Sequence, residues 1–194
     1  MEDFAELKSN IENCKACERK FGFCPHPIVF GSENSKIFQI SQAPSRNVHI
    51  TGKPFDDLSG KKLKYCWYQI TDDIFYNSQN FYIAALSHCY PGRTVSGNDK
   101  QPPKNCKERW LEKEMKIVKN DLYIIIGRSA AKSFFPEKEY DELIFSDNII
   151  LNEKTCLVLP HPSPLNIRWF KEHPEFEEQR INEIRKSIKR VLEI

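Results

Sequence analysis

Leu122-Tyr123-Ile124-Ile125-Ile126, followed at once by Gly127-Arg128-Ser129, is the stretch that decides the fold class. Four of its first five residues are aliphatic, which is typical of a strand buried on both faces of a sheet. The glycine and the polar pair then lead into a helix that we expect to continue through Phe135. A buried strand that turns directly into a helix predicts a βαβ unit and a parallel sheet.

The same alternation continues on both sides of this stretch. Short apolar runs predict strands at 37–40, 81–86 and 156–159, in addition to the one at 122–126. Helical spacing predicts helices at 3–16, at 61–70 after the turn residues Ser59 and Gly60, from a capping box of Asn105 and Glu108 through Val118, and at 181–191. We therefore expect a single domain over residues 1–194, a three-layer α/β/α architecture with a central four-stranded parallel sheet.

Length and composition agree with one globular domain. The chain has 194 residues, of which 40% are hydrophobic and 29% charged. The apolar runs are too short to span a bilayer, and the start lacks the pattern of a signal peptide, so we expect a cytoplasmic protein without a membrane partner. The sequence has no obvious oligomerisation motif, so we expect a monomer. The net charge of +2 does not exclude nucleic acid, because only the face that meets phosphate must be basic.

The residues that follow the four predicted strands are the first candidates for a functional site. In parallel sheets, ligands bind outside the carboxyl ends of the strands. The segments at those ends are Ser41-Gln42-Ala43-Pro44, Ser87-His88-Cys89, Gly127-Arg128-Ser129 and His161-Pro162-Ser163. The chain has no phosphate-binding Gly-x4-Gly-Lys-Ser/Thr run, dinucleotide fingerprint or nucleophile elbow.

The run from Thr51 to Gly60, TGKPFDDLSG, is the most informative loop. An aromatic such as Phe55 can stack on an extruded base. A carboxylate such as Asp56 or Asp57 can position water or stabilise positive charge on a sugar. The helix N-terminus after Ser59 could receive a phosphate. The alternative is a surface turn with solvated aspartates.

Two further loops carry groups that could hydrogen-bond a base. In the run from His161 to Asn166, HPSPLN, two prolines stiffen the backbone, so His161 would point in one direction and could donate to an oxygen of a departing base. Gln42 and the backbone amides at Ala43 could bond the edge of a base. The alternatives are an ordinary surface histidine and an ordinary polar loop. Side-chain packing is the expected role of a further group of aromatics: Trp67, Phe75, Tyr76, Trp169 and Phe170.

Seven cysteines are many for a reducing compartment, where metal binding is more common than disulfides. Cys14 and Cys17 form a C-x2-C pair, and Cys89 and Cys106 flank a proline-containing loop. Four thiolates could hold zinc or an iron–sulfur cluster, and ligand softness does not choose between them. Cys66 and Cys156 lie among apolar residues and are expected in the core, whereas Cys24 could be a spare ligand; in the alternative interpretation all seven are incidental.

The order of these motifs resembles the uracil-DNA glycosylase superfamily, especially its iron–sulfur branches of the family 4 and family 5 type. The resemblance covers roughly residues 14–190. It consists of the cysteine pair, Gln42-Ala43-Pro44 after a strand, the Thr51–Gly60 segment, Cys89 with Pro91, Pro102-Pro103 before Cys106, the strand 124–127 with Ala130-Ala131, and the terminal His-Pro-Ser. The order and spacing of the motifs are specific together, although no single motif is.

The resemblance implies a monofunctional DNA repair glycosylase that uses water to hydrolyse the N-glycosidic bond of uracil or a related deaminated base in DNA. It implies that Asp57 and His161 are catalytic, and that a structural 4Fe–4S cluster is bound. The cluster ligands would be Cys14, Cys17, Cys89 and Cys106. The base would be held by Gln42, Ala43, Phe55 and Asn166, and the DNA strand by Ser163, Arg168 and Trp169.

Two departures from the family pattern leave alternatives open. The loop Ser41-Gln42-Ala43-Pro44-Ser45 has no acid where many relatives place one to handle water, and Asp57 is the candidate in its place. Ala84-Ala85 stand where another branch has an asparagine that reads uracil, so the substrate could be hypoxanthine or another deaminated base. One alternative is a weak or inactive relative that binds damaged or single-stranded DNA. Another is a zinc-stabilised α/β protein of unrelated function.

Overall fold

The computed structural model describes residues 3–97 and 99–194 and contains a five-stranded sheet in the order β2-β1-β3-β5-β4. The parallel strands are β1 (Ile37–Ser41), β2 (Phe81–Ala85), β3 (Leu122–Ile126) and β5 (Lys154–Leu159). Each strand expected from the sequence is present. The expectation of a wholly parallel, four-stranded sheet is wrong in one respect: β4 (Ile150–Leu151) pairs antiparallel with β5. Its two residues are too few to give a strand pattern.

Short helical segments precede, connect and follow the strands. They are α1 (Phe4–Glu12), α2 (Glu18–Phe21), α3 (Arg46–Thr51), α4 (Leu58–Lys61), η1 (Lys62–Tyr68), α5 (Asp72–Phe75), α6 (Lys104–Cys106), η2 (Lys107–Leu111), α7 (Glu112–Ile117), α8 (Arg128–Phe134), α9 (Tyr140–Phe145), η3 (Pro164–Asn166), α10 (Ile167–Glu172), η4 (Phe176–Arg180) and α11 (Ile181–Leu192). No helix of the described residues is both long enough and apolar enough to cross a membrane.

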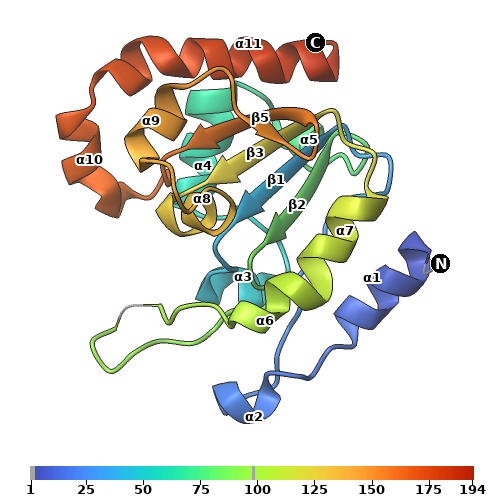
Figure 1. The fold of residues 1–194 in the computed structure, drawn as a ribbon. Helices are drawn as coiled ribbons and strands as arrows, with labels where there is room; N and C mark the ends of the chain where they lie inside the picture. The colour runs from blue at the N-terminus through green and yellow to red at the C-terminus, as the bar shows by residue number, and fades with distance from the viewer. Residues whose placement is uncertain (1–2, 98) are drawn as a thin grey trace.

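The sheet lies between two helical layers (Figure 1). Successive residues of β2 point to opposite faces: Phe81 packs on Phe75 of α5, with ring centroids 5.0 Å apart, whereas Tyr82 contacts Phe4 of α1 at 6.1 Å. Helices that follow β1 therefore cover one face, and α7, which follows β2, covers the other. β3 is fully buried, as its apolar run predicts.

Two expected helix starts are wrong. The capping box does not form, because α6 begins at Lys104 after Pro103 and Asn105 lies inside the helix. Ser59 and Gly60 are not turn residues before a helix but belong to α4, which begins at Leu58 with Asp57 as its N-cap. The helix thus begins three residues earlier than the sequence pattern indicates, which moves Asp57 to its N-terminus.

Candidate active site

A cavity of about 420 Å³ opens at the carboxyl ends of the strands. β1 leads into helices on one face of the sheet and β3 into helices on the other, so their exits diverge and leave a crevice, as at the switch points of other α/β sheets. The cavity is lined by segments after β1, β2 and β5. Its polar lining comprises Ser41, Gln42, Ser45, Asp57, Ser59, His88, Asp99, Lys100, His161 and Ser163, and its apolar lining includes Ala43, Phe55, Ala84 and Ala85.

Phe55 is held in an uncommon backbone conformation at the edge of this cavity. Its φ of 55° lies in the left-handed region, which costs a non-glycine residue about 1–2 kcal/mol. Gly60 makes the conformation possible, because a Cβ on Gly60 would lie 1.8 Å from the carbonyl oxygen of Phe55. The Tyr76 hydroxyl, 2.9 Å from the Pro54 carbonyl oxygen and 3.2 Å from that of Phe55, donates to these acceptors.

A buried lysine supports the tyrosine that anchors this loop. The side chain of Lys64 is only 2% exposed, and its Nζ donates to the Tyr76 hydroxyl at 3.1 Å and to Asp72 Oδ1 at 2.7 Å. The hydrogen bond from Lys64, and after it the one from Tyr65, hold the pKa of Asp72 below its usual range. The Phe55 loop therefore rests on a charged, hydrogen-bonded network, which the spacing of these residues does not reveal.

Asp57 has a structural role as well as a position in the cavity. Its Oδ1 accepts a hydrogen bond of 2.9 Å from the backbone N–H of Gly60, which caps α4. This helix N-terminus, expected to be free for a phosphate, is therefore already satisfied by a carboxylate. No hydrogen bond to Oδ2 of Asp57 is found within the described part of the chain, so that oxygen can face a ligand or water in the cavity.

His161 is fixed by its own loop. The backbone N–H of Ser163 donates to its Nδ1 at 3.2 Å, and the Asn166 side chain donates to its carbonyl oxygen at 3.3 Å. Because Nδ1 accepts, the neutral imidazole must carry its hydrogen on Nε2. The His161 side chain is accessible at the cavity mouth, but the surrounding protein atoms still desolvate the ring and lower its pKa; the charge of Asp57 opposes this only in part, so the neutral ring is favoured. Gly127 lies directly behind the ring.

The other expected DNA contacts lie in a second, more open hollow. His161 and Ser163 line both hollows, whereas Asn166, Arg168 and Trp169 line only the second, so Asn166 is not brought into the cavity with Gln42 and Phe55. The Arg168 side chain is 92% exposed and paired with Glu172. Trp169 is buried and its indole N–H donates to Asp141 at 2.8 Å, which favours the packing role over contact with DNA.

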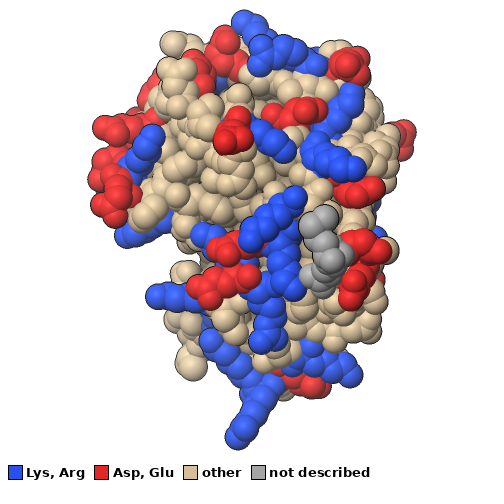
Figure 2. Space-filling view, turned by 45° about the vertical axis from the view of Figure 1, so that its right-hand side comes forward, with Lys and Arg blue, Asp and Glu red and all other residues tan. Residues whose placement is uncertain are grey.

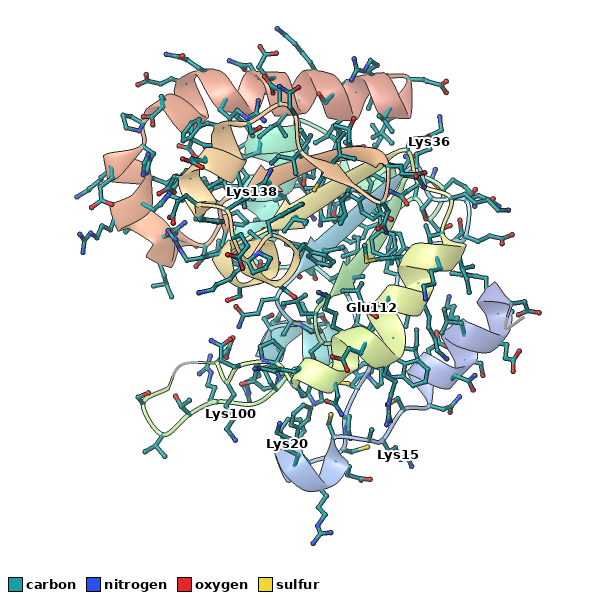
Figure 3. The ribbon with its side chains drawn as sticks, viewed as in Figure 1. Lys15, Lys20, Lys36, Lys100, Glu112 and Lys138 are labelled. Atoms are coloured by element: carbon teal, nitrogen blue, oxygen red, sulfur yellow. The ribbon has the colours of Figure 1, made fainter. Side chains whose placement is uncertain are left out.

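Cys14, Cys17, Cys89 and Cys106 converge on one small cavity beside α6, although they come from two segments far apart in the sequence. Figure 3 shows sulfur atoms gathered between α2 and α6. Burial, and then the neighbouring cysteines, raise the pKa of Cys17 and Cys89, so the four sulfurs repel one another as thiolates. Their positions do not form a ready coordination shell in residues 3–97 and 99–194. As a donor set, four convergent sulfurs nevertheless fit a soft metal centre.

The burial of the remaining three cysteines agrees only in part with the expectation. Cys156 is buried within β5, as expected of a small core residue. The expectation for Cys66 is wrong, because it is exposed. It lies between the buried Lys64 and Trp67 on a helix whose outer side faces solvent, and its apolar neighbours in sequence do not reveal which side it takes. Cys24 is also exposed and does not line the four-cysteine cavity.

His88 lies between the two cavities, and its position in the sequence, directly after a predicted strand, does not reveal this role. Among the described residues, it alone lines both the large cavity and the cysteine cavity. Its Nε2 is 2.9 Å from both carboxylate oxygens of Glu114, and its Nδ1 is 3.7 Å from the sulfur of Cys106. Burial opposes a charge on the ring, but Glu114 and Cys106 outweigh it and raise the pKa of His88 to about 10.

Positive charge gathers near the cysteine cavity and the large cavity. Figure 2 shows Lys and Arg side chains forming a band down the middle and lower part of one face, beside scattered acidic groups. Lys15, Lys20 and Lys100 lie at the lower end in Figure 3, near the cysteine segment and the loop before α6. The small net charge therefore conceals a local excess of basic groups, which Lys100 extends to the lining of the large cavity.

Comparison with known proteins identifies the family. The chain is 23% identical over 135 residues to the type-4 uracil-DNA glycosylase of Archaeoglobus fulgidus, a match that covers 70% of this chain and 65% of that protein's length. The family model described as the uracil DNA glycosylase superfamily matches residues 28–185, a range that includes the large cavity's loops and Cys89 and Cys106 but not Cys14 and Cys17. The chain therefore belongs to the uracil DNA glycosylase superfamily.

Proposed function

We propose that this protein is a monofunctional DNA glycosylase that hydrolyses the N-glycosidic bond of uracil, or of a related deaminated base, in DNA. One observation supports this most directly: Phe55, Asp57 and His161, from distant parts of the chain, line one cavity at the carboxyl edge of the sheet. An aromatic ring, a carboxylate and a neutral imidazole are the groups that this hydrolysis needs.

His161 is the residue proposed to stabilise the leaving base. As the C1′–N bond breaks, its electron pair stays on the base, and negative charge spreads onto a carbonyl oxygen. The Nε2–H of His161 is the donor available for that oxygen, because Nδ1 already accepts from Ser163. A neutral donor that needs no reorientation stabilises such charge more effectively than water does.

Asp57 is the proposed partner of the sugar and the water. Loss of the base leaves an oxocarbenium-like C1′, to which the oxygen of a water molecule bonds while one proton of that water passes to the Asp57 carboxylate or to solvent. The departed base anion takes up a proton from solvent. A carboxylate at this place can stabilise the cation and orient the water. The backbone N–H of Gly60 holds Oδ1 of Asp57, which fixes the direction in which Oδ2 points.

The extruded base would lie against Phe55, with its edge toward Gln42 and the backbone at Ala43. Extrusion costs a few kcal/mol and is easiest from single-stranded or mismatched DNA. Ala84 and Ala85 line the cavity where an asparagine side chain would otherwise protrude. The small side chains leave room for a deaminated purine such as hypoxanthine, so the proposal covers both uracil and that larger base.

The four-cysteine cavity is proposed to hold a structural 4Fe–4S cluster, with zinc as the less favoured occupant. Cys14, Cys17, Cys89 and Cys106 would be the ligands. Such a group would supply a rigid link between the segment after α1 and the loops that line the large cavity. The proposed partner is DNA, met by the basic face (Figure 2) and by Ser163 and Arg168, with the protein acting as a cytoplasmic monomer.

The decisive experiment is a cleavage assay on oligonucleotides carrying one uracil or hypoxanthine, single-stranded and paired. Asp57→Asn and Asp57→Ala form a matched pair, because asparagine can keep the N-cap of α4 while losing the charge. We expect alkali-sensitive cleavage by the wild type, a large loss in Asp57→Asn despite normal stability, and a similar loss in His161→Ala, which has no donor at the position of Nε2. Binding without cleavage of any substrate would favour the alternative, a relative that binds damaged DNA without cutting it.

A further inference from the structure

We propose that His88 is a positioning residue of the four-cysteine centre: its Nδ1–H donates to the sulfur of Cys106 and holds that ligand in place. This proposal rests on the proposed metal cluster but not on the glycosylase reaction. The contact joins His88 Nδ1 and Cys106 Sγ at 3.7 Å, within the range of a hydrogen bond to sulfur.

The orientation of the ring is fixed from its opposite side. The two Glu114 carboxylate oxygens each lie 2.9 Å from His88 Nε2, and the Tyr82 hydroxyl donates to Glu114 Oε1 at 2.7 Å. All three side chains are at most 2% exposed. A buried carboxylate that accepts from both partners leaves the imidazole one orientation, in which Nδ1 faces Cys106.

The backbone adds a second restraint on the same residue. The N–H of Ile28 donates to the carbonyl oxygen of His88 at 2.8 Å, and His88 precedes Cys89 in the chain. His88 therefore contacts the Cys106 sulfur through its side chain and is joined to Cys89 by a peptide bond. Partners of this kind, beyond the ligands themselves, typically change metal affinity about 10- to 100-fold when lost.

His88 also connects the centre to the base cavity. Among the described residues, it alone lines both the large cavity and the four-cysteine cavity. A shift of Cys106 would thus reach the wall of the large cavity through one rigid ring rather than through a flexible loop. Hydrogen bonds to ligand sulfurs also raise the reduction potential of iron–sulfur centres, because they stabilise the more negative reduced state.

The test uses two substitutions that each keep half of the imidazole's contacts. His88→Asn places an amide N–H close to the position of Nδ1 and keeps the donor to Cys106, whereas His88→Gln places one close to Nε2 and keeps only the contact with Glu114. The full chain is purified without oxygen. The measurements are iron per chain, absorbance near 400 nm, the rate of iron release to a chelator, and the midpoint potential. His173→Gln is the control, because His173 also contacts carboxylates but lines neither cavity.

We expect His88→Gln to release iron about tenfold faster or more and to have a lower midpoint potential, with His88→Asn close to the wild type. Equal behaviour of the Gln and Asn variants, whether both normal or both impaired, would overturn the assignment of the sulfur contact. A wild-type protein without iron would overturn the cluster and, with it, the role of His88. If the wild type contains iron and His88→Gln releases it at the wild-type rate, only the role of His88 would be overturned. Neither result depends on cleavage of DNA.

Discussion

Gly60→Ala is the substitution that most directly tests how the Phe55 loop is held in its conformation. An alanine Cβ would lie 1.8 Å from the Phe55 carbonyl oxygen, and real contacts of this kind are at least 3.0 Å, so the two must separate by about 1.2 Å. Alanine ordinarily stabilises a helix relative to glycine by about 1 kcal/mol. Here overpacking costs about 1–3 kcal/mol, so the net loss is at most about 2 kcal/mol.

The two expected consequences are of different size. A loss of about 2 kcal/mol lowers the melting temperature of a chain of this length by about 4–8 °C. A displacement of about 1 Å at a positioned group can cost about 100-fold in rate, so excision should suffer more than stability. The measurements are a thermal melt and a single-turnover excision assay on uracil-containing DNA.

Lys61→Ala is the matched control, because Lys61 occupies the next position of α4 and is exposed. It should leave both the melting temperature and the excision rate near those of the wild type. If Gly60→Ala melts and cleaves like the wild type, the close approach to Phe55 does not constrain the loop, and Gly60 does not fix the conformation of Phe55.

Three further predictions concern the loop support, the histidine and the cysteines. Tyr76→Phe removes the donor to the carbonyls of Pro54 and Phe55 and should cost about 1 kcal/mol in a thermal melt together with a loss of excision rate. The control is Tyr123→Phe, because the Tyr123 hydroxyl accepts from Asn152 on another loop, and it should change the excision rate little. In histidine NMR, His161 should titrate below about 6.5, the ordinary pKa of histidine, and Asp57→Asn should lower the pKa of His161 further. Because the folded protein binds a proton at His161 less readily than the unfolded chain does, stability should fall as the pH drops from about 6.5 through the folded-state pKa. His161→Gln should lack this loss. Cys106→Ser should abolish iron binding and Cys66→Ser should not; retention of iron by Cys106→Ser would contradict the ligand assignment.

The parts of the fold that the sequence pattern predicts are those governed by local periodicity. The apolar run at β3 and the shorter runs at β1, β2 and β5 identify the parallel sheet, and the rule for strand ends then locates the loops of Gln42 and His161. The sequence pattern does not predict β4, because two residues are too few to show the alternation of a strand. The start of α4 is misjudged because glycine commonly signals a turn, whereas here it is required by a close backbone approach.

Long-range pairing explains what the sequence could not show about the site. Lys64 reads as an ordinary helical lysine, and only the folded chain reveals that it is buried against Tyr76 and Asp72. Likewise, Glu114 lies on a helix full of charged residues, and nothing local marks it as the buried partner of His88. Trp169 has a sequence position that suits DNA contact, but its ring packs inside the protein.

The large cavity has a consequence for how the protein comes into being. Its walls come from residues 28 to 163, and its histidine follows β5, the last strand to be synthesised. A growing chain would therefore carry the Phe55 loop and all four converging cysteines well before His161 could join them. During synthesis, the cysteine segments can therefore come together first, and the large cavity is completed later, when the segment after β5 adds His161.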